Sequence, residues 1–385
     1  MNNFQFYNPV KILFGKGQIA AITKEIPADA RVMMTYGGGS IKQNGVYEQV
    51  MEALQGHTVF EFQGIEPNPR YETLMQAVGI AKREQIDFIL AVGGGSVIDG
   101  TKFIAAAALY EGLNPWDLLS KGIKPTQAIP FGAVLTLPAT GSEMNSGAVI
   151  TREETKEKFS FGSPFTFPKF SVLDPETTFT LPLRQISNGV VDAFTHVLEQ
   201  YLTYPVNSPL QDRMAEAILL TLKEEGPKAL DNPQDYDTMA NIMWAATMAL
   251  NGVIRVGVPT DWATHYIAHE LTALHGIDHA RTLAIVLPSL LRYKQETKKE
   301  KLLQYGERIW DVTVGTDDEK IEATIQATLS FFESLDIPTR LQDYEVEQDT
   351  IQMIVQRFKE RGVKNLGERS DIQIEDVEKI LTLSL

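Results

Sequence analysis

The chain has 385 residues, of which 43% are hydrophobic and 22% are charged, and these proportions exclude a disordered, collagen-like or coiled-coil protein. The formal net charge of −15 argues against nucleic acid as a partner, because a phosphate-backbone binder needs a basic stripe. Since there is no cysteine, a metal ion would have to be bound by imidazole and carboxylate groups, and no disulfide framework can form.

The length is sufficient for two hydrophobic cores, so we expect two domains. No apolar run approaches the length of a membrane span, and the first residues have neither the basic nor the apolar region of a signal peptide. We therefore expect a cytoplasmic protein that does not enter a membrane.

The first half of the sequence alternates short apolar runs with helical patterns, which predicts a doubly wound α/β layer around a parallel sheet. The predicted strands are Arg31–Tyr36, Thr58–Phe62, Phe88–Val92 and Gly132–Leu137, and the predicted helices include Gly45–Leu54 and Tyr71–Glu84. In such a layer, ligands bind at the carboxyl ends of the strands.

Two glycine runs lie at those carboxyl ends. Gly93-Gly94-Gly95-Ser96 precedes a predicted helix, Val97–Ala107, whose free N–H groups and positive dipole end favour an anion. We assign this turn to the diphosphate of a dinucleotide, because the missing Cβ atoms allow close approach of the backbone. The alternative is a tight strand-to-helix turn without a ligand.

The other glycine run, Gly37-Gly38-Gly39-Ser40, stands where a dinucleotide-binding domain often carries an acidic residue for the adenosine ribose. No Asp or Glu occurs from Val32 to Val46, and Ser40 and Lys42 offer a setting for a phosphate. The sequence therefore favours NADP(H) over NAD(H).

After Leu181-Pro182, apolar residues recur at helical spacing, so we place an α/β dinucleotide-binding domain at 1–182 and an all-α metal-binding domain at 183–385. The predicted helices are Leu210–Glu225, which we expect to stop at Gly226-Pro227, then Asp237–Leu250, and then Ile321–Leu335 behind a capping box at Thr316–Glu319.

The histidines carry the strongest chemical signal, since five of the six lie between residues 192 and 279 in two short stretches. The pairs Asp192/His196, His265/His269 and His275/His279 are each four residues apart, which places both members on one face of a helix, although Gly276 is a helix breaker within the last pair. A single pair of this kind is more often a hydrogen-bonded core histidine. Together they predict a site for Fe²⁺ or Zn²⁺ with a position open to a substrate oxygen, without showing which of the four later histidines are ligands.

Several motifs in order resemble the iron-containing (group III) alcohol dehydrogenase family over essentially the whole chain. They are Ile12–Gly17, Gly93–Asp99, Thr140-Gly141-Ser142-Glu143 and Gly189–His196. The Gly-Gly-Gly-Ser run within Thr35–Lys42 resembles the run at this position in one branch of the family, the NADPH-dependent aldehyde reductases and butanol dehydrogenase-like enzymes. The segment Leu137–Glu143 is shorter than in most members.

The resemblance implies a role for individual residues. Its metal ligands fall on Asp192, His196, His265 and His279; His269 would lie near the nicotinamide and handle a proton, and His275 receives no role. The implied nucleotide contacts are Asn68, Gly94, Gly95, Ser96, Asp99, Thr136, Thr140 and Lys158, with Gly38 and Ser40 at the 2′-phosphate. Without the family, Asp99 reads as a helix-dipole carboxylate, Lys158 as part of a solvated hairpin or loop, and Asn68 as a turn residue.

The implied activity is hydride transfer between NADP(H) and a primary alcohol or aldehyde, in a homodimer. A second hypothesis is a lyase of the related metal- and nucleotide-dependent sugar-phosphate cyclase type, but Val253–Arg281 offers only Arg255 and Arg281 to bind a substrate phosphate and carboxylate. A third is a metal- or nucleotide-binding protein without turnover.

Overall fold

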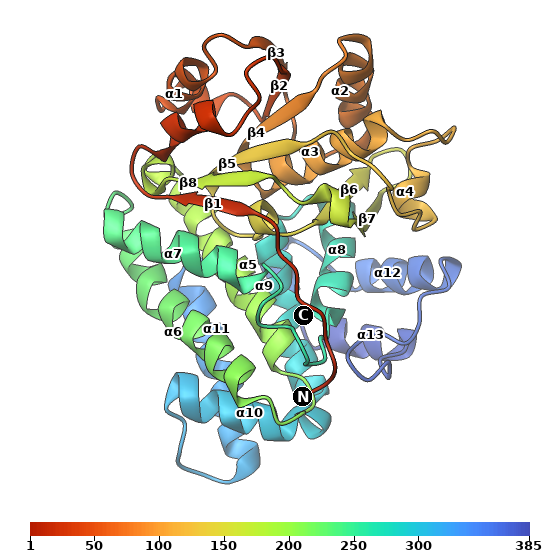
Figure 1. The fold of residues 1–385 in the computed structure, drawn as a ribbon. Helices are drawn as coiled ribbons and strands as arrows, with labels where there is room; N and C mark the ends of the chain where they lie inside the picture. The colour runs from red at the N-terminus through yellow and green to blue at the C-terminus, as the bar shows by residue number, and fades with distance from the viewer. The chain divides into compact units, whose positions relative to one another are not determined.

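The computed structural model describes residues 1–385, and the chain forms two compact units (Figure 1). One unit consists of Tyr7–Pro182 and Asn232–Asn251, and the other consists of Met1–Phe6, Leu183–Asp231 and Gly252–Leu385. None of the helices combines the length and the apolar character that a membrane crossing requires.

A six-stranded sheet, entirely parallel, forms the centre of the first unit (Figure 1). Its order is β1-β8-β5-β4-β2-β3, and its strands are β1 (Lys11–Phe14), β2 (Arg31–Tyr36), β3 (Thr58–Gln63), β4 (Phe88–Gly94), β5 (Phe131–Leu137) and β8 (Phe170–Leu173). The four predicted strands are therefore confirmed, with β4 extended into the glycine run.

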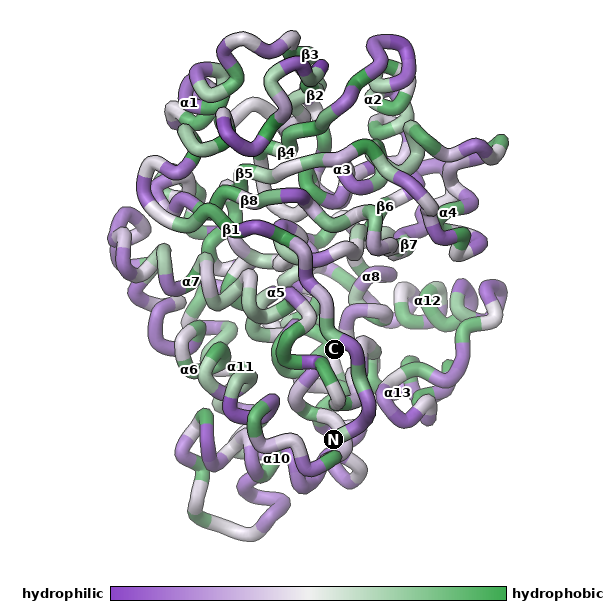
Figure 2. Tube along the Cα trace, in the orientation of Figure 1, coloured by the Kyte–Doolittle hydropathy of each residue, from purple (hydrophilic) through white to green (hydrophobic).

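Alternate residues of the central strands enter two separate cores, which explains why these strands are apolar throughout. In β2, Met33 packs with α2 (Tyr71–Arg83) and α3 (Gly95–Ala108), whereas its neighbours Val32 and Met34 pack with α1 (Val46–Ala53). Hydrophobic residues predominate along β4 and β5 in Figure 2. The sheet is covered on both faces, and the predicted α/β class is confirmed.

Two further helices and a hairpin of two strands belong to this unit. A short helix, α4 (Asp117–Ser120), precedes β5, and β6 (Gly147–Arg152) pairs with β7 (Glu157–Gly162) in an antiparallel hairpin. Helix α7 (Tyr236–Ala249), predicted as Asp237–Leu250, comes from the second half of the chain but belongs to the unit of the sheet.

The other unit is helical, with one isolated bridge between Leu366 and Ile372. Its helices are α5 (Leu183–Tyr201), α6 (Pro209–Asp231), α8 (Ala263–His275), α9 (His279–Tyr293), α10 (Gln295–Trp310), α11 (Asp317–Ser334), α12 (Gln348–Glu360) and α13 (Ile374–Thr382). Residues of α8, α9, α12 and α13 share one hydrophobic core. The predicted capping box is present, since Thr316 Oγ1 accepts the N–H of Glu319 while a Glu319 carboxylate oxygen accepts that of Thr316.

One predicted helix end is wrong. Helix α6 begins at Pro209, one residue before the predicted start, but it continues through Gly226-Pro227 to Asp231. Gly226 lies against α5, where an added Cβ would come within 3.0 Å of Val190 Cγ1, and Ala229 beyond the proline is fully buried. Packing of this last turn therefore outweighs the hydrogen bond that a proline removes from a helix.

Candidate metal centre and cofactor turn

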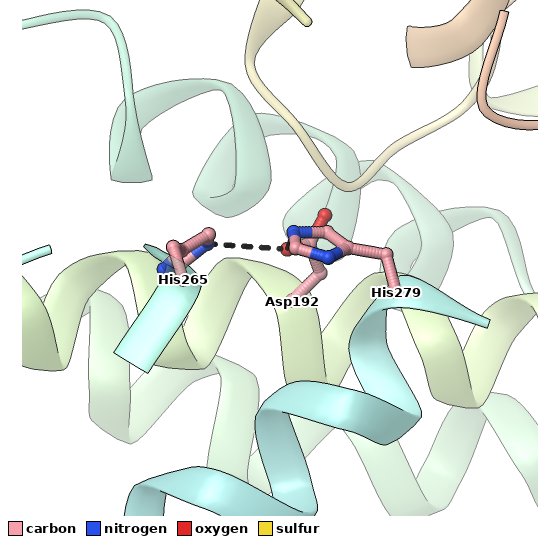
Figure 3. Close-up of side chains that lie close together, drawn as sticks. All are labelled: Asp192, His265 and His279. Atoms are coloured by element: carbon pink, nitrogen blue, oxygen red, sulfur yellow. Dashed lines mark ion pairs between the residues drawn. The ribbon is translucent and has the colours of Figure 1, made fainter. Parts of the chain in front are cut away.

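Three helices of the second unit bring a carboxylate and three imidazoles together. Asp192 and His196 lie one turn apart on α5, His265 lies in the first turn of α8, and His279 is the first residue of α9. Asp192 Oδ1 is 3.6 Å from His196 Nε2, 3.9 Å from His265 Nε2 and 3.9 Å from His279 Nε2. Figure 3 shows Asp192 between His265 and His279, with the ion pair to His265 drawn.

The spacing and the chemistry of these groups fit one divalent ion. Asp192 Oδ1 lies 3.6 Å, 3.9 Å and 3.9 Å from the three imidazole nitrogens, and two atoms bound about 2.1 Å from a common ion are up to about 4.2 Å apart. His265 Nε2 is buried without a hydrogen-bond partner, an arrangement that costs free energy unless something binds it. A carboxylate with imidazoles suits a first-row divalent metal.

Glu199, which the sequence analysis overlooked, holds His265 from the other side. Its Oε2 contacts His265 Nδ1, while its Oε1 accepts the backbone N–H of Thr264 at 2.7 Å. A histidine that donates Nδ1–H to a carboxylate presents Nε2 as the free ligand atom. Glu199 lies three residues after His196 on α5, and this helical spacing was the signal that could have identified it.

The carboxylates also set the protonation of His265. Burial alone would lower its pKa, but the negative charges of the neighbouring Glu199 and Asp192 outweigh burial and raise the pKa to about 9. In the metal-free protein the imidazole is therefore protonated at neutral pH. A metal ion must displace this proton in order to bind.

The backbone around these ligands is fixed by further polar contacts. Asp261 Oδ1 accepts the N–H of Ala263 at the start of α8, after Trp262 in the left-handed region with φ of 66°. Asp278, which precedes α9, accepts hydrogen bonds from Arg184 and Asn188 of α5, both at 2.8 Å. These contacts tie the first residue of α9 to the helix that carries Asp192.

Of the two remaining histidines in this region, His269 lies beside the proposed ligands and His275 does not. The ring of His269 lies 5.1 Å from that of His279 and 6.5 Å from that of His265, measured between centroids. His275 instead contacts Thr350 Oγ1 through Nε2 at 3.0 Å. The expectation that His275 and His279 share one helix face is wrong, because α8 ends at Gly276 with φ of 69° and α9 begins at His279.

In the unit of the sheet, the glycine turn joins β4 to α3. An added Cβ would lie 2.6 Å from Val97 Cγ2 at Gly93, 2.9 Å from Leu137 Cβ at Gly94 and 2.4 Å from Thr140 Oγ1 at Gly95. The glycines are therefore required by the protein's own packing, and close approach of a ligand is not needed to explain them. The free N–H groups of the first turn of α3 remain suited to an anion.

Several residues with expected cofactor roles gather near this turn. Asn68, with φ of 56°, donates its backbone N–H to Ser96 Oγ at 3.3 Å and accepts a hydrogen bond from Lys158 Nζ at 2.9 Å. Lys158 lies on β7 of the hairpin, and Thr140 packs on Gly95. Both oxygens of Asp99 have partners in the protein, namely Ser142 Oγ at 2.5 Å and the N–H of Val149 at 2.8 Å.

The other glycine run has a different neighbourhood. At Gly38 an added Cβ would meet no atom within 4 Å, so this part of the run is open. Lys42 lies over the rings of Tyr36 and Tyr47, with its Nζ 3.5 Å from a carboxylate oxygen of Glu61. Glu61 lies on β3, outside Val32–Val46, so the sequence of that segment gives no sign of this acidic residue.

A doubly wound sheet with a glycine turn at a strand end, and a helical unit with a carboxylate and imidazole cluster, are the features expected of a metal-dependent dehydrogenase. The family model of iron-containing alcohol dehydrogenases matches residues 9–175. The model of the C-terminal part of the Fe-containing alcohol dehydrogenase family matches residues 186–385. The chain belongs to the iron-containing alcohol dehydrogenase family.

Individual relatives are similar over their full lengths. The chain is 58% identical over 97% of both chains to the NADPH-dependent aldehyde reductase YqhD of Escherichia coli. It is 45% identical over 100% of both chains to the probable NADH-dependent butanol dehydrogenase 1 of Bacillus subtilis. A crystal structure of E. coli YqhD matches with a TM-score of 0.98 and 56% identity, over 100% of this chain and 99% of that one. The NADH-dependent butanol dehydrogenase A of Thermotoga maritima matches with a TM-score of 0.95 and 38% identity over the same shares.

Proposed function

We propose that this protein is a metal-dependent oxidoreductase that transfers hydride between NADP(H) and a primary alcohol or aldehyde. The observation that carries the proposal is the convergence of three imidazole nitrogens on Asp192 Oδ1 in a chain of this family. The full-length similarity to an aldehyde reductase and to butanol dehydrogenases supports the same class of substrate.

The proposed ligands are Asp192, His196, His265 and His279, which would hold one Fe²⁺ or Zn²⁺. When bound, the ion supplies Lewis-acid polarisation of the substrate oxygen and NADPH supplies the hydride. Glu199 orients His265 so that Nε2 faces Asp192. To His269, whose ring lies beside that of His279, we assign the holding of a proton at an imidazole nitrogen and its exchange with water.

We assign the cofactor to the unit of the sheet. The proposed contacts are Gly38 and Ser40 for the 2′-phosphate, and Asn68, Gly94, Gly95, Ser96, Asp99, Thr136, Thr140 and Lys158 for the rest of the nucleotide. In functional terms we divide the chain into a cofactor-binding domain, 1–182, and a metal-binding domain, 183–385. We further propose a homodimer located in the cytoplasm.

Two observations favour NADPH as the cofactor, and two others do not. The segment Val32–Val46 has no acidic residue, and the 58% identical relative is named NADPH-dependent. However, Glu61 lies near this segment, and the 45% identical relative is named NADH-dependent. Rates with NADPH and NADH at equal concentration decide the point.

The activity is tested by following NADPH oxidation with butanal at about 340 nm after the purified protein has been loaded with Fe²⁺ or Zn²⁺. We expect turnover by the wild type and loss of turnover in His265→Ala and His279→Ala, because each removes a ligand. Unchanged kcat in either variant contradicts the ligand assignment. Binding of NADPH without turnover across a panel of aldehydes and alcohols favours a binding protein instead. The lyase hypothesis is not favoured by the relatives, which are dehydrogenases and reductases by name.

A further inference from the structure

Lys102 is a buried lysine that the proposed function leaves without a role. It lies on α3, seven residues after Gly95, and its exposed fraction is 0%. Its Nζ donates to Ser142 Oγ at 2.7 Å, to Asn145 Oδ1 at 3.0 Å and to the carbonyl oxygen of Gly147 at 2.7 Å. An ammonium group has three donors, so every donor of Lys102 is used on one loop.

That loop, Thr140–Gly147, follows β5 and depends on the same acceptors for its own shape. Asn145 donates through Nδ2 to the carbonyl oxygen of Gly141 at 2.8 Å, and its Oδ1 also accepts the N–H of Gly147 at 3.0 Å. Ser142 Oγ accepts from Lys102 and donates to Asp99 Oδ1. The lysine therefore links the two ends of the loop to the helix that begins at the glycine turn.

The other side of the loop packs on the glycine turn itself. Thr140 Oγ1 lies 2.4 Å from the position of a Cβ on Gly95, and Ser142 donates its N–H to Thr140 Oγ1 at 3.2 Å. A displacement of Ser142 is thus transmitted directly to Thr140, which is one of the proposed cofactor contacts. The loop has no direct backbone pairing with α3 that would replace the lysine.

Burial of the charged Lys102 ammonium costs free energy. Burial lowers the pKa of Lys102 to about 8, against the opposing charges of Asp99 and Glu143. Glu143 is itself buried and accepts a hydrogen bond from Thr247 of α7 at 2.5 Å. Well-packed apolar residues often give equal or greater stability than buried charges of this kind, so stability alone does not explain the lysine.

We propose that Lys102 is a positioning residue for the cofactor: its three hydrogen bonds hold the Thr140–Gly147 loop on the glycine turn in the conformation that receives the dinucleotide. The inference rests on the proposed function, because it assigns the cofactor to this turn. Lys102 does not touch the cofactor in this role, since its donors are all used within the protein.

The test compares Lys102→Met, which keeps the length of the side chain and removes all three donors, with Thr101→Val. Thr101 is the adjacent buried residue, and its hydroxyl bonds to Val97 O at 2.8 Å and to Thr35 Oγ1 at 2.7 Å without touching the loop. NADPH binding is measured by fluorescence titration of the full-length protein, alongside the midpoint of thermal unfolding without cofactor and the metal content.

We expect Lys102→Met to raise the Kd and the KM for NADPH by about 10-fold or more, with metal content and kcat at saturating NADPH near those of the wild type. Thr101→Val should lose thermal stability but keep the wild-type Kd. A wild-type Kd in Lys102→Met overturns the inference, and so does an equal loss of NADPH binding in both variants.

If Lys102→Met does not fold, Ser142→Ala decides the matter, because it keeps the ammonium and removes one acceptor and the link to Asp99. We expect a smaller rise in Kd, roughly 3-fold or more, and an unchanged Kd overturns the inference. If the wild type does not bind NADPH, both the proposed function and this inference are overturned. If the wild type binds NADPH and the variants bind it equally well, only this inference is overturned.

Discussion

A single carboxylate, that of Glu199, controls both the side chain and the backbone of a proposed metal ligand. One oxygen contacts His265 Nδ1 and the other accepts the N–H of Thr264, so the imidazole is fixed in its ring orientation and its helix is fixed at the first turn. Because Nδ1 of the ring faces Glu199, Nε2 on the other side of the ring faces Asp192.

Replacement of Glu199 by glutamine should lower metal affinity by about 10-fold to 100-fold, since Thr264 and His265 contact different oxygens and an amide has only one. The affinity is measured by competition with a chromophoric chelator, so the result does not depend on activity. Glu216→Gln is the matched control, because Glu216 is a buried glutamate on α6 that accepts hydrogen bonds from Tyr201 and Arg308. Equal affinities of the wild type and Glu199→Gln would contradict this role.

The sequence indicated parts of this site and not others, for physical reasons. The spacing of Asp192 and His196 identified a helix face, because a helix repeats every 3.6 residues. Glu199, the one glutamate of α5, also lies at helical spacing from His196, but spacing alone does not show that its carboxylate contacts His265 of another helix. The pair His275/His279 has the same spacing, yet Gly276 ends the helix between them and only His279 faces Asp192.

At the scale of elements, the turn from β4 to α3 is packed so closely that it has no room for side chains on its glycines. Gly95→Ala should destabilise the protein by about 1–3 kcal/mol, because its Cβ would lie 2.4 Å from Thr140 Oγ1. Gly79→Ala on α2 is the control, since that glycine is exposed and an added Cβ meets nothing within 4 Å. It should stabilise by about 0.5–1 kcal/mol. Urea unfolding of both variants without cofactor measures the two changes in the free energy of unfolding. An unchanged free energy in Gly95→Ala would show that the turn can relax.

Element ends were predictable where a local signal decides them. Gly276 ends α8 and the Thr316 capping box starts α11, and both act through backbone groups a few residues away. The end of α6 was not predictable from Gly226-Pro227, because contacts with α5 decide it. The strands around the glycine runs were recognised from composition, whereas their order in the sheet required the structure.

At the scale of the whole molecule, a buried group of three charges makes stability depend on pH. Lys298 Nζ donates to Asp261 Oδ2 at 2.6 Å and to Glu368 Oε2 at 2.9 Å. Burial and the neighbouring Asp261 raise the pKa of Glu368 from its ordinary 4.5 to about 7, although Lys298 opposes the shift. The folded protein thus binds more protons than the unfolded chain between these values.

The contribution of the Glu368 carboxyl to stability is therefore fully present below pH 4.5 and is lost as the pH rises through about 7. Glu368→Gln keeps the shape of the protonated carboxyl and cannot ionise, so its unfolding free energy should fall less than that of the wild type between about pH 5 and pH 8. Urea unfolding at several pH values gives both slopes. Parallel slopes for the two proteins would mean that Glu368 does not titrate in this range.

Helix α7 has a consequence for how the protein is made. It follows α5 and α6 along the chain, yet its Thr247 donates to the buried Glu143, and the carbonyl oxygen of nearby Asn251 accepts from Asn8 at 3.0 Å. During translation, the unit of the sheet can be completed only after residue 251 has left the ribosome, because α7 is part of that unit. A gene cut after codon 182 would encode a sheet without that helix, and so would not yield two independently folding halves.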